Sequence, residues 1–306
     1  MPCFNEEAGL SKTIEAVYAK LSILIKDGKI SPNSTMLFVD DGSTDSTWSI
    51  IEEAHALSEK VKGIKLAANR GKEYALFAGL MEARNIADIV VSMDADMQHD
   101  IESIDNFLEK RREGYELVYG VKASRGVESS LRKITAHAFY FLMSKLGSPV
   151  LPGHSDYCLA SKMVLDALSE YQECYIMVRA LLYQLGFKKC AVYFSVKDRS
   201  MGKSKMTIRN LVNLSLSAIT SFSVFPLRVI ALIGVMIFLI SLLMICWCMY
   251  DFFVIGTPSG WATLICSLWF IGGLGMISLS IVGEYIGKIY METKRRPRYY
   301  INQKIK

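Results

Sequence analysis

Two patterns of hydrophobic and polar positions divide the chain. Up to about residue 200, short apolar runs alternate with amphipathic segments. The runs at 35–40 ("TMLFVD"), 63–69 ("GIKLAAN"), 88–94 ("DIVVSMD") and 116–122 ("ELVYGVK") predict strands, and the segments at 46–57 and 73–86 predict helices. Nearly continuous apolar strands separated by helices are typical of a parallel sheet covered on both faces. We therefore predict an α/β domain over residues 1–205.

After Pro226 the chain becomes far more apolar. Residues 229–250 ("VIALIGVMIFLISLLMICWCMY") and 261–283 carry no charge. Each run is longer than the roughly 20 residues that cross a bilayer. We predict a transmembrane hairpin with spans at 229–250 and 261–286. Residues 206–228 have apolar positions at helical spacing with Thr, Asn and Ser between them, which predicts an interfacial amphipathic segment.

The distribution of basic residues predicts the orientation of this hairpin. The link at 251–260 has no Lys or Arg, whereas Arg228 precedes the first span and a basic tail, 287–306, follows the second. Basic residues stay on the cytoplasmic side. We expect a multi-pass protein of the cell membrane with the α/β domain and both termini in the cytoplasm.

Composition changes this picture little. Of 306 residues, 51% are hydrophobic and 21% charged, and the mean hydropathy of +0.26 is high for a soluble protein. The net charge of +5 gives no argument for a nucleic-acid partner. The seven cysteines form no CxxC or Cys/His cluster, as expected for reduced structural thiols.

The candidate chemistry lies where the predicted strands end. In "VVSMDADMQHD" (90–100), Asp94 and Asp96 follow an apolar run, and ligands of parallel sheets bind beyond the carboxyl ends of the strands. Two carboxylates one residue apart suit Mg²⁺, which keeps waters and takes few protein ligands. Gln98 could add a ligand or orient a water. A solvated turn or a helix N-cap would also explain these acidic residues.

A second acidic loop, "VDDGSTDST" (39–47), follows another predicted strand. Asp41 could accept hydrogen bonds from a nucleobase or a ribose. The sequence has neither a P-loop nor a GxGxxG turn, which disfavours an ATPase or a dinucleotide enzyme. Two basic segments, 129–137 and 198–205, could hold phosphates or form a solvated face attracted to anionic lipid; their candidates are Arg132, Lys133, Arg199, Lys203 and Lys205.

Six segments then occur in an order that resembles family 2 glycosyltransferases. They are "PCFNEE", "VDDGSTDST", "ANRGKEYALFAGL", "VVSMDADMQHD", "YGVK" and "DRSMGKSKMT" with its continuation "SFSVFPLR". The resemblance is to the polyprenyl-phosphate sugar transferases, the group of dolichol-phosphate mannose synthase and bactoprenol glucosyltransferase. It implies a GT-A fold, a nucleotide-diphosphate sugar (UDP-glucose-like is favoured), Mg²⁺ or Mn²⁺, an inverting reaction, and a polyprenyl phosphate acceptor such as undecaprenyl phosphate. The implied pathway is cell-envelope glycan synthesis or modification.

The resemblance also implies roles for residues by position. Those implied to line the nucleotide are Pro2, Phe4, Glu6, Val39 and Asp41. Those implied to hold the metal and the diphosphate are Asp94, Ala95, Asp96 and Gln98. Phosphates would face Lys122, Arg199 and Lys205, while Asp156 matches an acidic position proposed as a base or a sugar-orienting residue.

Three departures from the family pattern stand out. The family's first strand, which normally precedes the "PCFNEE" turn, is expected to be missing here. Lys122 stands where many relatives have Arg, which replaces a bidentate fork by a point charge. The segment "HSDYCLAS" around Asp156 also differs from the usual pattern, so the sugar stays open.

The reaction itself needs little acid–base chemistry. A phosphate monoester has a second pKa near 6 and is mostly ionised at pH 7, so it is already a nucleophile. The harder step is departure of the nucleotide diphosphate, which a divalent cation assists.

Two alternatives stay open at this point. One is a family 2 enzyme with a non-prenyl acceptor, for polysaccharide or glycolipid synthesis, although the Q-x-x-R-W segment of polysaccharide synthases is absent. The other is a degenerate, non-catalytic membrane partner protein, against which the intact Asp94-Ala95-Asp96 argues. Whether the protein forms a homo-oligomer is also open.

Overall fold

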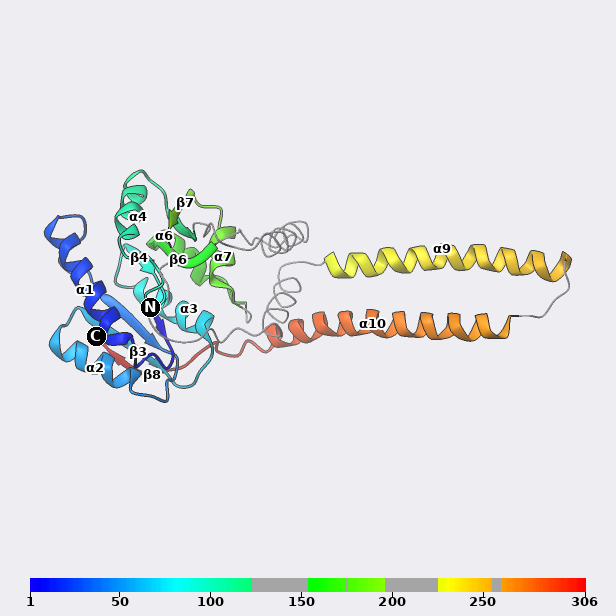
Figure 1. Cartoon of the computed structure of the whole chain (residues 1–306), viewed down its shortest axis with the longest axis horizontal. Helices are drawn as coiled ribbons and strands as arrows, with labels where there is room; N and C mark the ends of the chain where they lie inside the picture. Colours follow the sequence, from blue (N-terminus) through cyan, green and yellow to red (C-terminus); the bar gives the residue numbers. More distant parts are fainter. Residues whose placement is uncertain (123–153, 174–175, 196–224, 255–259) are drawn as a thin grey trace. The chain divides into compact units, whose positions relative to one another are not determined.

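The computed structural model describes residues 1–122, 154–173, 176–195, 225–254 and 260–306. The chain divides into two compact units (Figure 1). The sheet unit contains Met1–Phe141, Pro149–Lys205 and Arg295–Lys306, and the long-helix unit contains Leu142–Ser148 and Met206–Lys294. The two units are described separately below.

The first sheet of the sheet unit has parallel strands at its centre. Its spatial order is β1 (Pro2–Cys3), β2 (Met36–Asp40), β3 (Val61–Leu66) and β8 (Ile301–Ile305). Strands β1, β2 and β3 are parallel, and β8 is antiparallel to β3. Strand β1 consists of the first two residues of the "PCFNEE" segment, where Pro2 pairs with Val39 and Cys3 with Asp40.

The second sheet is mixed. Its spatial order is β4 (Ile89–Ser92), β6 (His154–Ser161), β5 (Leu117–Lys122) and β7 (Lys189–Phe194). Strands β5 and β7 are parallel, but β6 is antiparallel to both β4 and β5. Because Ser92 pairs with Cys158, the start of β6 lies beside the end of β4. This reversal brings Asp156 next to the segment that follows β4, residues 94–100, which is called the acidic loop from here on.

Helices cover these sheets and share one core with them. The described helices of the unit are α1 (Leu10–Lys26), α2 (Thr47–Leu57), α3 (Lys72–Ala83), α4 (Ser103–Arg112), α6 (Lys162–Ser169) and α7 (Val178–Gln184). In α1, the buried Leu10, Ile14 and Val17 recur at helical spacing. The core joins Phe38 of the first sheet to Val118 of the second, so the two sheets form one domain.

The end of the chain returns to the sheet unit. Besides the pairing of β8, the guanidinium of Arg298 donates hydrogen bonds to the carbonyls of Tyr171 and Glu173, at 2.5 and 2.9 Å. The same group lies over the ring of Phe77, 4.6 Å from its centroid. The pattern analysis does not predict this strand, and the tail expected over 287–306 is helix to Thr293 and strand from Ile301.

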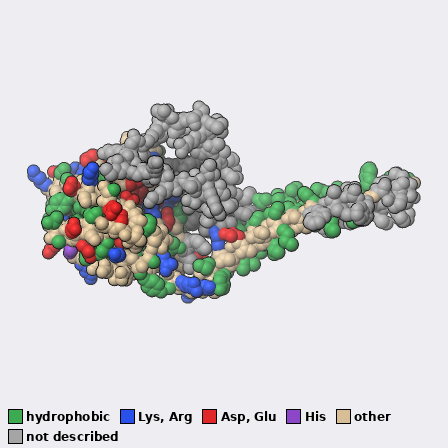
Figure 2. Space-filling model, turned by 60° about the horizontal axis from the view of Figure 1, so that its bottom comes forward, with side chains coloured by type: hydrophobic (Ala, Val, Ile, Leu, Met, Phe, Trp, Pro, Cys, Tyr) green, Lys and Arg blue, Asp and Glu red, His purple; other side chains and the backbone are tan. Residues whose placement is uncertain are grey.

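The long-helix unit contains α9 (Phe225–Val254) and α10 (Trp261–Thr293), which contact each other and run in opposite directions in Figure 1. Large apolar side chains of both helices are exposed, including Leu243, Leu268 and Met276, and Figure 2 shows hydrophobic side chains gathered along this unit. Within the described residues, one segment is long and apolar enough to cross a membrane, Phe270–Thr293, with a mean hydropathy of 1.4. The two-span hairpin stays a prediction.

Candidate active site

The acidic loop begins two residues after β4, and hydrogen bonds fix its conformation. The amide of Gln98 donates a hydrogen bond to Oδ1 of Asp96, at 3.1 Å, and Met97 has a positive φ of 57°. The carbonyl of the buried Ala95 accepts a hydrogen bond of 2.8 Å from the hydroxyl of Thr13 in α1. One hydrogen bond within the loop and one from α1 therefore fix the segment that carries the carboxylates of Asp94 and Asp96.

His99 fixes the start of this loop. Its Nδ1 accepts a hydrogen bond from the amide of Asp94, at 3.1 Å, so the proton lies on Nε2, which is 3.1 Å from the hydroxyl of Ser155. The ring is buried and stacks on Tyr157, with the centroids 4.8 Å apart. Burial lowers the pKa of His99, although the charge of Asp94 opposes this shift. A neutral histidine thus ties the acidic loop to β6.

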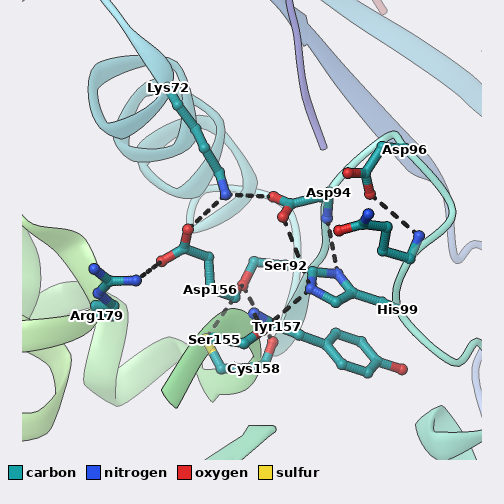
Figure 3. Close-up of polar contacts among 11 residues, drawn as sticks. Lys72, Ser92, Asp94, Asp96, His99, Ser155, Asp156, Tyr157, Cys158 and Arg179 are labelled. Atoms are coloured by element: carbon teal, nitrogen blue, oxygen red, sulfur yellow. Dashed lines mark hydrogen bonds and ion pairs between the residues drawn. The ribbon is translucent and has the colours of Figure 1, made fainter. Parts of the chain in front are cut away.

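Lys72, the first residue of α3, bridges the acidic loop and β6 (Figure 3). Its Nζ lies 2.7 Å from Oδ1 of Asp94 and 2.6 Å from Oδ2 of Asp156. The Asp156 side chain is buried, at 8% exposed, whereas that of Asp94 is 26% exposed. Burial works against the charge of Lys72, but the attraction of Asp156 and Asp94 outweighs it and raises the pKa of this lysine. The three groups form a charged cluster at the strand ends.

Glu73, the next residue of α3, reaches a different element. Its Oε2 accepts a hydrogen bond of 2.8 Å from the amide of Val178, the first residue of α7. The following residue, Arg179, extends toward Asp156, with 3.9 Å between Nη1 and Oδ1 (Figure 3). Burial, followed by repulsion from Asp156, raises the pKa of Glu73 from 4.5 to about 7. Lys72 therefore contacts Asp156 directly. The adjacent Glu73 holds the start of α7, from which Arg179 reaches the same carboxylate.

Asp41 fixes the loop from which α3 begins. Its Oδ1 and Oδ2 accept hydrogen bonds from the amides of Arg70 and Gly71, both at 2.8 Å. Burial raises the pKa of Asp41, and these amide hydrogen bonds oppose the shift. Gly71 has a φ of 97°, a backbone conformation that residues other than glycine rarely adopt. The side chain predicted to contact a nucleotide is thus buried against the turn that presents Lys72.

The structure brings only part of the predicted site together. Asp94, Asp96, Gln98 and Asp156 lie in the acidic loop or beside it, and Lys122 is exposed at the end of β5. Near the end of β2, Pro2 and Val39 are paired; Phe4 is 37% exposed, and Glu6 lies near Thr47, whose hydroxyl accepts its amide hydrogen bond at 2.9 Å. Outside the described residues lie Arg132, Arg199 and Lys205.

Four residues of this site are not predicted from the sequence: Lys72, Glu73, His99 and Arg179. A signal for Lys72 exists: a cation in the first turn of a helix opposes the helix dipole, so a lysine directly after Gly71 indicates a carboxylate partner. For Glu73 and Arg179 there is no comparable signal, because their contacts depend on how α7 lies against α3.

The donor groups of this loop fit a hard divalent cation. Across the described residues, no group of three or more His, Cys, Asp or Glu side chains could hold a metal ion. Mg²⁺ is commonly held by one or two carboxylates together with substrate phosphates and waters. Asp94 and Asp96, both partly exposed, would supply those carboxylates, so the residues present fit a metal that arrives with a phosphorylated substrate.

Fold and site define an α/β protein of the glycosyltransferase class, with a mixed sheet and an acidic loop after β4. Residues 1–168 match the family model described as "Glycosyl transferase family 2", and the chain belongs to this family. The GT-A-like fold and the family expected from the sequence are thereby confirmed.

Relatives match over nearly the whole chain. An uncharacterized glycosyltransferase, YkoT, of Bacillus subtilis is 41% identical over 99% of this chain and 90% of its own length. The bactoprenol glucosyl transferase of Shigella phage SfX is 34% identical over 99% of this chain and 98% of its own length. These matches confirm the resemblance to the polyprenyl-phosphate sugar transferase group.

Among solved structures, the mannosyltransferase PcManGT from Pyrobaculum calidifontis in complex with GDP-Man and Mn²⁺ is 17% identical with a TM-score of 0.48, covering 72% of this chain and 61% of that one. Glucosyl-3-phosphoglycerate synthase from Mycobacterium tuberculosis is 20% identical with a TM-score of 0.44, covering 72% and 75%.

Proposed function

We propose that this glycosyltransferase moves a sugar from a nucleotide-diphosphate sugar to a polyprenyl phosphate such as undecaprenyl phosphate. The observation that carries the proposal is the match to the bactoprenol glucosyl transferase of phage SfX, which extends over 99% of this chain and so includes α9 and α10. That name favours a UDP-glucose-like donor. The product would serve cell-envelope glycan synthesis or modification.

The donor would bind at the strand ends of the sheet unit. In this proposal Pro2, Phe4, Glu6, Val39 and Asp41 line the nucleotide, and Ala95 lies under the diphosphate. Asp94 and Asp96, with Gln98 beside them, hold Mg²⁺ or Mn²⁺. When bound, the cation supplies charge neutralisation for the departing nucleotide diphosphate.

The transfer would be a single displacement. An oxygen of the acceptor phosphate attacks the anomeric carbon and forms the new bond. The bond from that carbon to the diphosphate oxygen breaks on the opposite face, its electron pair leaves with the nucleotide, and the configuration inverts. Because the acceptor phosphate is mostly ionised at pH 7, Asp156 is needed to orient a sugar hydroxyl and not to remove a proton.

Basic residues would hold the acceptor phosphate beside the donor. Lys122 at the end of β5 is exposed and available for this role, and Arg132, Arg199 and Lys205 are proposed to act with it. A dianionic acceptor and an anionic donor repel each other, so these cations would lower the energy of bringing the two together.

The long helices would place this site at a membrane. We propose that residues 229–250 and 261–286 cross the bilayer as a hairpin, that 206–228 lies in the interface, and that residues 1–205 and both termini are cytoplasmic. The exposed apolar side chains of α9 and α10 and the candidate span Phe270–Thr293 support this arrangement. A lipid phosphate would then meet the catalytic domain at the membrane surface.

A partition assay tests the proposal. The full chain, purified in detergent, is incubated with radiolabelled UDP-glucose, Mn²⁺ and undecaprenyl phosphate, and the product is extracted into organic solvent. Label in the organic phase that depends on the lipid supports the proposed acceptor. Label that enters only a polysaccharide or a glycolipid favours the non-prenyl alternative. No transfer from any of a panel of nucleotide sugars favours the non-catalytic one.

A further inference from the structure

Lys72 binds a carboxylate that a divalent cation would also bind. Its ammonium group lies 2.7 Å from Oδ1 of Asp94, one of the two carboxylates proposed to hold the metal. The other oxygen, Oδ2, is 3.7 Å from Nε2 of His99. A metal that binds Asp94 must therefore compete with an ammonium group that is already hydrogen-bonded to this carboxylate.

The second partner of Lys72 is better placed to retain it. Asp156 is the more buried carboxylate, at 8% exposed against 26% for Asp94, and its contact to Nζ is 2.6 Å. Arg179 forms a longer ion pair with Asp156, at 3.9 Å. Burying a charged carboxylate is costly unless it is paired, so the more buried Asp156 gains more than Asp94 from keeping its contact with Lys72.

The backbone of Lys72 is fixed, which separates it from an ordinary surface lysine. Asp41 holds the amides of Arg70 and Gly71 immediately before it. The carboxylate of Glu73, immediately after it, is bonded to the amide of Val178. The side chain can change partners while its Cα stays in place, because its neighbours on both sides are anchored.

We propose that Lys72 is a positioning residue that competes with the divalent cation for Asp94 and, once the metal is bound, remains on Asp156 to orient it for the reaction. This inference rests on the proposed metal-dependent sugar transfer. In the donor-free enzyme the single positive charge of Lys72 is shared between both carboxylates and weakens metal binding. The metal then binds well only when a donor diphosphate adds its own negative charge, and this couples metal binding to donor binding.

The proposal predicts opposite changes in two measurements. Replacing Lys72 by Met removes the competing cation and its repulsion of the metal, so Mn²⁺ should bind the donor-free protein about tenfold more tightly, within the usual range of coupling between two sites. The same change removes the 2.6 Å contact between the Lys72 ammonium and Asp156, so kcat should fall at least tenfold while the apparent KM for Mn²⁺ does not rise. A lysine that merely stabilises the fold would not produce a gain in metal affinity.

Mn²⁺ binding is measured on the full chain in detergent, without nucleotide sugar, from the electron paramagnetic resonance signal of free Mn²⁺. Lys72→Arg retains the charge and should bind Mn²⁺ within about twofold of the wild type. Lys20→Met is the matched control, because Lys20 also bridges two carboxylates, those of Glu102 and Asp105, each at 2.5 Å. It should leave Mn²⁺ affinity unchanged. Circular dichroism checks that each variant is folded.

The outcomes separate this inference from the proposed function. Tighter Mn²⁺ binding by Lys72→Met, absent in Lys72→Arg and Lys20→Met, supports the competition. Unchanged or weaker binding in a folded Lys72→Met overturns it and leaves the proposed reaction untouched. Absence of Mn²⁺ binding in both the wild type and Lys72→Met, up to millimolar Mn²⁺, overturns the competition and the metal site together. Failure of lipid glycosylation with tighter binding intact overturns only the acceptor.

Discussion

The amide of Asp94 donates its hydrogen bond to Nδ1 of His99, 3.1 Å away, five residues further along the same loop. The ring that accepts this bond is stacked on Tyr157 and lies 3.1 Å from the hydroxyl of Ser155. A neutral imidazole is therefore one of the contacts that attach the acidic loop to β6, and the orientation of Asp94 depends on that ring.

Replacing His99 by Phe should expose this dependence. The ring and its stacking remain, but the amide of Asp94 loses its acceptor, and an unsatisfied buried group costs about 1–3 kcal/mol. We expect a lower free energy of unfolding by this amount and a weaker apparent affinity for Mn²⁺. Asparagine at this position can still accept a hydrogen bond and should recover part of both. Wild-type Mn²⁺ affinity in His99→Phe would contradict the role assigned to the ring.

Asp96→Asn tests the metal site more directly. The Oδ1 acceptor for the amide of Gln98 is retained by asparagine, so the loop should stay folded, while the negative charge is lost. We expect turnover to be abolished and thermal stability to be unchanged. EDTA should stop the wild-type reaction, and added Mg²⁺ or Mn²⁺ should restore it. Full activity in EDTA would remove the metal from the proposal.

The pH dependence of stability should depend on Glu73. Its pKa is raised from 4.5 to about 7 in the folded protein by burial and by Asp156. Between these values the unfolded chain has lost the proton that the folded protein keeps, so stability falls as pH rises through this window and is lowest above about 7. The change over the whole window is about 3 kcal/mol.

Glu73→Gln removes this titration and keeps an acceptor for the amide of Val178. Thermal unfolding of the full chain in detergent, at pH 5 and pH 8, should show that the variant gains stability relative to the wild type at pH 8 and gains little at pH 5. Arg179, Lys72 and Asp156 face Glu73 and are unchanged in both proteins. The same difference between wild type and variant at both pH values would place the titration elsewhere.

Topology can be tested by labelling. The distribution of basic residues predicts that the link between the spans is outside the cell. A Ser259→Cys variant should react with a membrane-impermeant maleimide added to intact cells, and a reporter fused after Lys306 should be active only in the cytoplasm. Cys246, which is exposed within α9, requires a control without the added cysteine. A labelled C-terminus with an unlabelled link would reverse the orientation.

How far the sequence predicts this molecule depends on how local each signal is. The strands at 35–40, 88–94 and 116–122 were predicted, because a buried strand shows its apolar run directly, and they correspond to β2, β4 and β5. By contrast, β8 has the sequence "INQKI", is mostly exposed, and pairs with the edge of β3. A polar edge strand has no periodic signal of its own.

The candidate site shows the same division. Asp94 and Asp96 could be predicted, because acidic residues after an apolar run are visible in one segment. The link between Asp94 and Asp156 could not be predicted from local pattern, because it depends on β6 running antiparallel to β4 and pairing Cys158 with Ser92. Lys72 acquires its role only through that pairing, which brings its two carboxylate partners within 2.7 Å of one ammonium group.

The pairing of β8 with β3 has a consequence for biosynthesis. Residues 301–305 leave the ribosome only after the whole of α9 and α10 has been made. Until then the edge of β3 has no partner, and an open strand edge is a site for pairing with other chains. This sheet can be completed only after both long helices have been synthesised, so a chain that stops between Thr293 and Ile301 would contain both long helices but lack the fourth strand of the sheet.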